Sequence, residues 1–155
     1  MTSLRIGLIS DTHGLLRPQA LAALQGCDHI LHAGDIGKPE ILDALAELAP
    51  LTAVRGNNDR DAWADAVREV EELWLGKLGI YLVHDQADIP DELAGRGFGV
   101  VVTGHSHKPL VTERAGLLHV NPGSAGPRRF KLPVSVGFLT VEGGEVRVEL
   151  MELQA

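Results

Sequence analysis

The sequence contains one cysteine, Cys27, among its 155 residues. An intrachain disulfide is therefore impossible, and a reducing compartment is the default expectation. The chain also lacks the apolar run of ~20 residues that a membrane-spanning helix requires. Its first residues do not combine a basic region with a long apolar core, as a secretory signal does. These absences predict a cytoplasmic protein that does not bind membranes.

Aromatic residues and positive charge are also scarce. Phe, Trp and Tyr make up 4% of the chain, and the formal net charge is −7. Proteins that bind nucleic acid combine a basic surface with aromatic side chains on which the bases stack. A nucleic-acid partner is therefore disfavoured. A phosphate group could still bind in a pocket with local positive charge, especially one that holds divalent cations.

The sequence does have an ordinary globular composition, with 45% hydrophobic and 23% charged residues. Its length fits one compact domain with a hydrophobic core. Because we find no internal repeat, low-complexity tract or linker, we expect a single domain over residues 1–155.

The first third of the chain alternates between apolar stretches and segments with helical periodicity. This pattern predicts strands at residues 4–9, 29–32 and 51–54 and helices at residues 17–24 and 39–48. Strand–helix–strand repetition with short links implies right-handed crossovers in a parallel sheet.

The remainder of the chain is rich in strands and has one short helix, expected at residues 91–96. The strands are expected at residues 70–75, 78–83, 98–102, 111–114, 117–120, 135–141 and 146–150. The whole pattern predicts an α/β fold in which two sheets pack face to face with helices outside.

Polar side chains that bind metals occur where several predicted strands end. They lie in Asp11–His13, Gly34–Asp35, Gly56–Asp59, Val83–His84 and Gly104–His107, and the loop Asn121–Ser124 follows. Ligands gather beyond the carboxyl ends of strands in α/β sheets, so these side chains should converge on one edge. Oxygen donors combined with imidazoles suit Mn²⁺, Fe²⁺, Ni²⁺ or Zn²⁺ better than Ca²⁺ or a thiolate zinc site.

Two pairs of these candidate ligands, Asp11 with His13 and His105 with His107, are separated by one residue. In an extended backbone such residues project to the same side, so Asp11 and His13 could bind one ion, and His105 and His107 repeat this spacing. Asp35 is the natural bridge between two ions, because a neutral imidazole cannot bind two cations.

The remaining candidate ligands are Asn57, which offers a neutral carbonyl oxygen, and His84 at the end of a strand. Two ions about 3.5–4 Å apart would polarise a phosphoryl group and lower the pKa of a bridging water. The resulting hydroxide could attack phosphorus, so no protein nucleophile is required. The sequence therefore predicts a metallohydrolase.

Each stretch has a simpler interpretation when taken alone. An Asp after a strand is usually a cap or turn residue, and Gly56–Asp59 could be only a turn. His84 alone is more often a core histidine than a ligand. The complete set, in this order and at successive strand ends, favours the metal site over these separate interpretations.

Several neighbouring residues have open roles. His32 is close enough to Asp35 to support it. Asp59 could cap the following segment, or orient Asn57 or a nearby histidine. The basic residues after the Asn121–Ser124 loop could contact a substrate phosphate or could be surface charges: Arg128, Arg129 and Lys131.

These stretches together resemble the calcineurin-like metallophosphoesterase superfamily. Its pattern is Asp-x-His, Gly-Asp, Gly-Asn-x-Asp/Glu, a strand-end His and Gly-His-x-His, and the resemblance covers nearly the whole chain. The chain is especially similar to the small, cap-less bacterial and archaeal phosphodiesterase branch, the YfcE type. The resemblance implies a four-layer α-β-β-α sandwich of two mixed sheets flanked by helices. It also implies two divalent ions, with Mn²⁺ preferred and Ni²⁺, Fe²⁺ or Zn²⁺ possible.

The resemblance further implies a role for each residue that matches the pattern. One ion would be bound by Asp11, His13, Asp35 and His107. The other would be bound by Asp35, Asn57, His84 and His105. The residues expected to act in catalysis are Asp35, Asn58 and His105.

The sequence departs from the superfamily at two positions. Many members have His directly after the metal-binding Asn, where this chain has Asn58, and this difference puts efficient general-acid catalysis in doubt. Asp85 follows His84 where Gly is commoner. Asp85 could orient a histidine or face solvent.

Small phosphodiesters are the expected substrates, and two other functions remain open. One is a non-catalytic interaction scaffold, as in the retromer sorting subunit of similar fold. The other is a nucleotide or dinucleotide hydrolase. A homo-oligomer is possible.

Overall fold

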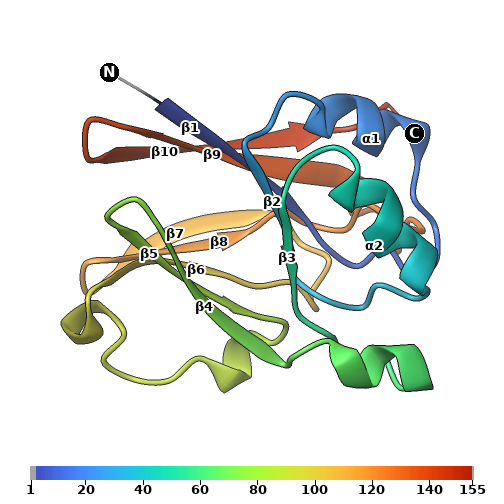
Figure 1. Ribbon diagram of the computed structural model, residues 1–155, viewed down its shortest axis with the longest axis horizontal. Coiled ribbons are helices and arrows are strands. Elements are labelled where there is room, and N and C mark those ends of the chain that lie inside the picture. The colour runs from blue at the N-terminus through green and yellow to red at the C-terminus, as the bar shows by residue number, and fades with distance from the viewer. Residues whose placement is uncertain (1–2, 155) are drawn as a thin grey trace.

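The computed structural model describes residues 3–154 and consists of two five-stranded sheets with helices at the outside (Figure 1). The strands are β1 (Ser3–Ile9), β2 (His29–His32), β3 (Leu51–Ala53), β4 (Val70–Leu75), β5 (Leu78–Val83), β6 (Phe98–Val102), β7 (Leu110–Arg114), β8 (Leu117–Asn121), β9 (Ser135–Glu142) and β10 (Glu145–Glu152). The helices are α1 (Pro18–Leu24) and α2 (Pro39–Ala46), with 3-10 helices η1 (Ala62–Ala66), η2 (Gln86–Asp88) and η3 (Ala94–Arg96).

Sheet A has the strand order β10-β9-β1-β2-β3. Strands β1, β2 and β3 are parallel, as the sequence predicts, and β9 and β10 add an antiparallel hairpin at one edge. Both α-helices begin with proline. The first N–H groups of a helix have no intrahelical acceptor, so proline, which lacks an N–H, costs no hydrogen bond at this position. The two helices pack their apolar side chains on the outer face of sheet A through Leu24, Ile41 and Leu45.

Sheet B has the strand order β4-β5-β6-β8-β7, with β5, β6 and β8 parallel and an antiparallel strand at each edge. Its inner face packs against the inner face of sheet A. The shared core contains Leu8 and Leu31 from sheet A and Leu82, Val100 and Val102 from sheet B, all at most 1% exposed. The two sheets therefore form the central layers of the predicted four-layer arrangement.

The layer outside sheet B is thinner than the layer outside sheet A. A segment with η2 and η3 covers Tyr81, Phe98 and Val101 through Leu93. The sequence predicts a helix at residues 91–96, but the structure has a turn followed by the 3-10 helix η3. Glycines explain the difference, because Gly95 has low helix propensity and Gly97, at φ 95°, ends the segment.

Strand ends of both sheets meet at one edge of the sandwich. The N–H of Asp11, after β1, donates to Gly34 O after β2 at 2.9 Å. In sheet B, the N–H of Gly104, after β6, donates to His84 O after β5 at 2.9 Å. These loops contain the predicted ligands, so the topology brings them to the same region.

No helix within residues 3–154 is both long enough and apolar enough to cross a lipid bilayer.

Candidate metal centre

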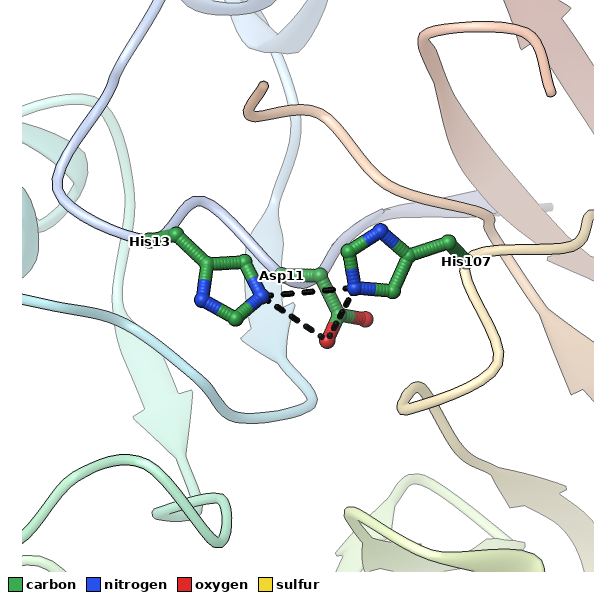
Figure 2. A group of neighbouring side chains, drawn as sticks. All are labelled: Asp11, His13 and His107. Carbon is green, nitrogen blue, oxygen red and sulfur yellow. Dashed lines mark hydrogen bonds and ion pairs between the residues drawn. The ribbon is translucent and has the colours of Figure 1, made fainter. Parts of the chain in front are cut away.

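The first group of candidate ligands consists of Asp11, His13 and His107, whose ligand atoms lie within 4.8 Å of one another. Figure 2 shows the two imidazoles facing the carboxylate of Asp11 from opposite sides. His107 Nε2 is 3.5 Å from Asp11 Oδ1, and His13 Nε2 is 3.7 Å from the same oxygen. The two Nε2 atoms are 3.3 Å apart. Donors from the loops after β1 and β6 therefore surround one small volume.

The second group consists of Asp35, His84 and His105, again within 4.8 Å. His84 Nε2 lies 3.2 Å from Asp35 Oδ2. The two groups adjoin, because His13 Nε2 is 3.7 Å from Asp35 Oδ2 and His84 Nε2 is 3.9 Å from Asp11 Oδ1. Asp35 thus lies between the histidines of both groups, which is the position that a bridging carboxylate requires.

The backbone at five of the seven candidate ligands is left-handed rather than extended. The φ angles are 55° at Asp11, 45° at His13, 54° at Asp35, 71° at His105 and 63° at His107. The expectation that each i, i+2 pair projects from an extended backbone is therefore wrong. Tight turns aim the side chains instead. A non-glycine residue in this region costs about 1–3 kcal/mol, so the surrounding structure must hold it there. Such residues cluster at functional sites.

The two oxygens of Asp11 have different surroundings. Oδ2 accepts hydrogen bonds from Ser10 Oγ at 2.7 Å and from the N–H of His105 at 3.1 Å. Oδ1 is buried and has no hydrogen-bond partner among residues 3–154. This oxygen faces the imidazoles of His13, His84 and His107. A buried carboxylate oxygen without a partner is costly unless a cation binds it, so this position fits a metal ion.

Burial raises the pKa of Asp11, and the nearby histidines and Ser10 oppose that increase. At Asp35 burial has the same tendency. The interaction with His84, the N–H of Asn58 and neighbouring charges outweigh it and lower the pKa of Asp35 to about 2. Asp35 is therefore an anion at neutral pH. Two carboxylates in so small a volume favour the binding of positive charge.

The ring of His84 is oriented by the backbone of sheet A. Its Nδ1 lies 2.7 Å from Ala33 O, a contact that requires the proton on Nδ1. Nε2 of the neutral ring then carries a lone pair, and this buried atom has no hydrogen-bond partner in the described part of the chain. Burial lowers the pKa of His84, but the carboxylates of Asp35 and Asp11 raise it above its ordinary value. A histidine fixed by its second nitrogen is typical of metal sites.

His32 supports the site from behind without facing it. Its Nδ1 accepts from the N–H of Gly34 at 3.1 Å, so Nε2 donates to Thr12 Oγ1 at 3.0 Å. Thr12 in turn donates to Ile36 O at 2.8 Å. Complete burial and the charge of His84 lower the pKa of His32 to about 3, so the ring is neutral. The chain of bonds ties the Asp11–His13 turn to the loop that contains Asp35.

Asp59 also joins two loops. Its Oδ2 accepts from the N–H groups of Ile36 at 3.0 Å and Gly56 at 2.9 Å, and its Oδ1 accepts from Gly37 at 3.0 Å. The roles considered for Asp59 from the sequence, a cap and a partner that orients Asn57 or a nearby histidine, differ from this one. The carboxylate holds the loop after β2 against the loop after β3.

Asn57 and Asn58 lie on an exposed turn. Asn57 lines a hollow of about 300 Å³ together with His84 and Asp85. Asn58 contacts Asp35 twice, through its N–H to Oδ1 at 2.9 Å and through Nδ2 to Oδ2 at 3.2 Å. Its observed contact is therefore with the carboxylate that lies between the two groups.

His105 is the most open of the candidate histidines, with 45% of its side chain exposed. Its Nε2 lies 3.8 Å from Asp85 Oδ2, while Asp85 Oδ1 accepts from the N–H of Ala87 at 3.0 Å. Asp85 thus caps η2 and also faces His105. Of the alternatives considered for Asp85, orientation of a histidine is the one that this geometry fits.

Sequence reasoning assigned no role to several supporting residues, although they lie in or beside the predicted stretches. Ser10 and Thr12 flank Asp11 and make the bonds described above. Asn121 donates from Nδ2 to Gly104 O at 2.9 Å and to Ser106 Oγ at 3.1 Å, which shapes the turn that carries His105. Gly104 has no room for a side chain, because a Cβ there would lie 2.7 Å from Asp11 Oδ2. Polar residues next to ligand positions were the signal available in the sequence.

Comparison with known proteins adds three findings. Residues 4–144 match the model of the calcineurin-like phosphoesterase superfamily domain. A probable metallophosphoesterase of Methanothermobacter thermautotrophicus is 34% identical over 161 residues, which cover 97% of this chain and 93% of the relative. The phosphodiesterase YfcE of Escherichia coli is 28% identical over 160 residues, covering 88% of this chain and 87% of the relative.

Solved structures include wild-type Vps29 from Entamoeba histolytica in complex with zinc. It is 26% identical, with a TM-score of 0.71, and the match covers 96% of this chain and 99% of that one. The predicted α-β-β-α fold is therefore shared with known proteins over almost the whole chain.

Proposed function

The chain belongs to the calcineurin-like phosphoesterase superfamily, and from this premise we propose that it hydrolyses small phosphodiesters at a centre of two divalent ions. The observation that supports the proposal most directly is a pair of buried ligand atoms without hydrogen-bond partners among residues 3–154. They are Asp11 Oδ1 and His84 Nε2, one from each group, which lie 3.9 Å apart, and Asp35 Oδ2 lies 3.2 Å from His84 Nε2.

The proposed ligands are the seven residues that match the superfamily pattern. One ion would be bound by Asp11, His13, Asp35 and His107. The other would be bound by Asp35, Asn57, His84 and His105. The donors in each set are oxygen atoms and imidazole nitrogens, which divalent ions of the first transition series favour.

Bound divalent ions polarise a phosphoryl oxygen and lower the pKa of a coordinated water. Neighbouring protein groups orient the proposed ligands. Asn58 holds both oxygens of Asp35, and Ser10 fixes Oδ2 of Asp11 so that Oδ1 faces the imidazoles. Ala33 O keeps the proton of His84 on Nδ1. His105 is partly exposed beside this cluster, where it could hydrogen-bond to a substrate oxygen.

The finer expectations from the sequence remain proposals. We propose Mn²⁺ as the preferred ion, small phosphoesters as the partners, and a cytoplasmic location. The relatives named phosphodiesterase and metallophosphoesterase support the substrate class. A homo-oligomer and a nucleotide or dinucleotide substrate are compatible with the same site.

The test is hydrolysis of bis-p-nitrophenyl phosphate by purified protein loaded with Mn²⁺, Ni²⁺ or Zn²⁺, with metal content measured by elemental analysis on the same samples. We expect turnover that depends on added metal, is abolished by a chelator and returns when metal is restored. A folded protein that binds two ions per chain but hydrolyses none of a broad panel of phosphoesters would contradict the proposal. Fewer than two ions together with no turnover would favour the interaction scaffold.

A further inference from the structure

A second hollow lies on the open side of the first ligand group. It measures about 420 Å³ and is lined by His13 and His107 together with Pro127, Arg128, Arg129 and Phe130. Sites for small molecules usually fall between ~300 and 1,000 Å³. The hollow is thus large enough for the part of a substrate that extends from a phosphate held at the ligand groups.

The segment that forms this hollow is anchored to the Asp11–His13 turn. Ser124 Oγ donates to Asp11 O at 3.0 Å, and the N–H of Ala125 donates to Ser10 O at 3.0 Å. Arg17 donates from Nη2 to Gly126 O at 3.2 Å. Residues after Gly126 therefore leave a fixed point at the ligand cluster, and the hollow has a defined position relative to it.

Phe130 is placed unlike the other two phenylalanines of the chain. Phe98 is 5% exposed and Phe138 is fully buried, whereas Phe130 is 88% exposed. Its φ is 54°, and the N–H of Leu132 donates to Arg129 O across it at 3.1 Å. An exposed aromatic ring contributes nothing to the core, and a left-handed backbone costs energy for so bulky a residue. The turn therefore holds the Phe130 ring in solvent, and its left-handed backbone destabilises the folded protein.

Positive charge accompanies the ring, although the chain carries a net charge of −7. Arg128 and Arg129 line the same hollow. A phosphate held at the ligand groups would bring its own negative charge beside these arginines.

We propose that Phe130 is a specificity-determining residue that stacks on the base of a nucleotide-containing phosphodiester while its phosphate binds at the ligand groups. The proposal rests on the proposed function and names the substrate class for it. The flat ring, the adjacent arginines and the open hollow next to His13 and His107 are the features that such a substrate requires. Stacking on an aromatic ring accepts any base, because every base has a π-face.

The experiment compares two inhibitors of bis-p-nitrophenyl phosphate hydrolysis by the Mn²⁺-loaded protein. Adenosine 5′-monophosphate and ribose 5-phosphate share the sugar phosphate and differ by the base. We expect the nucleotide to bind about tenfold more tightly, the effect of one base–aromatic stack. Phe130→Ala should reduce this ratio to about one by weakening only the nucleotide, and Phe130→Trp should retain it.

Trp74→Ala is the matched control, because Trp74 is also an exposed aromatic residue, at 52%, but lies on β4 and does not line this hollow. It should leave the ratio unchanged. An equal ratio in the wild type and in Phe130→Ala, or no preference for the nucleotide in the wild type, would overturn the proposal while leaving the hydrolase intact.

A second measurement does not need turnover. In Phe130→Trp, nucleotide binding should quench the fluorescence of the introduced indole, and ribose 5-phosphate should not. If the metal-loaded protein hydrolyses no phosphoester, the proposed function fails, and this titration still decides whether the ring binds a base. Absence of quenching at saturating nucleotide would count against the stacking role.

Discussion

The two groups of candidate ligands differ in how firmly the fold holds them. In the first group Asp11 is fully buried, His107 is 3% exposed, and 23% of the His13 side chain is exposed. In the second group Asp35 and His84 are equally buried, but 45% of the His105 side chain is exposed and Asn57 lies on an exposed turn. Packing holds most of the first group in place, whereas the second group is open to solvent at His105 and Asn57.

This difference has a thermodynamic consequence. A group already fixed in place loses little conformational freedom when a ligand binds, whereas mobile side chains must be ordered at that moment. We therefore expect the first group to bind its ion more tightly and the second group to exchange its ion more readily.

Substitution of Asp35 should affect both groups at once, because its carboxylate contacts histidines of both. Asp35→Asn should lower kcat/KM by more than about 100-fold, since even residues that only hydrogen-bond to ligands change activity or affinity 10–100-fold. Steady-state hydrolysis and elemental analysis check this result. Asp91→Asn, at an exposed acid away from the site, is the control. Two bound ions with undiminished turnover would show that Asp35 is not shared.

A matched pair of histidine variants should sharpen the comparison. His107→Ala should lose the ion that survives gel filtration in metal-free buffer. His105→Ala should retain that ion and weaken only the second one, about tenfold or more by the same scale. Metal content per chain and calorimetric titration measure both effects. The reverse pattern, with His105→Ala losing the tightly bound ion, would contradict the assignment of the first group as the firmer one.

A smaller effect is expected from Asn58→Ala, which affects the second group through Asp35. The variant removes the hydrogen bond from Nδ2 to Asp35 Oδ2 but keeps the bond from the N–H to Oδ1. Loss of one of two supports should lower kcat/KM about tenfold, at the low end of the range for such partners. Titration of the metal should show weaker binding of the less tightly held ion. Unchanged rates and affinities would mean that the amide does not position Asp35.

The smallest effect is expected from Asp85→Asn. The interaction between Asp85 and His105 joins two partly exposed side chains at 3.8 Å, and such pairs contribute only ~0.2–1 kcal/mol. The amide oxygen can still accept from Ala87, so η2 should persist. We expect kcat/KM to change by less than about fivefold. A loss as large as that of Asp35→Asn would indicate that Asp85 acts on the reacting groups directly.

Much of the fold could be predicted from the sequence because the relevant signals are local. The alternation of apolar stretches with helical segments located β1, β2, β3, α1 and α2 to within a few residues. Binding residues at successive strand ends could be grouped because parallel strands end at one edge. In the structure, all the candidate carboxylate and histidine ligands fall into the two groups.

Other features depend on the tertiary structure and have no local signal. The left-handed turns at Asp11 and His107 exist only because neighbouring loops hold them. The bonds from His32 to Thr12 and from Asp59 to three N–H groups join segments that are distant in sequence. An α-helix was expected in the outer layer over sheet B, but the apolar residues at positions 89–94 pack there without forming one.

The left-handed turns also imply a trade-off between robustness and activity. Glycine adopts positive φ about as readily as negative φ, so replacing His13 or His107 by glycine would relieve strain of about 1–3 kcal/mol at each position. A variant with glycine at these positions would lose two proposed metal ligands and should have a higher melting temperature than the natural chain.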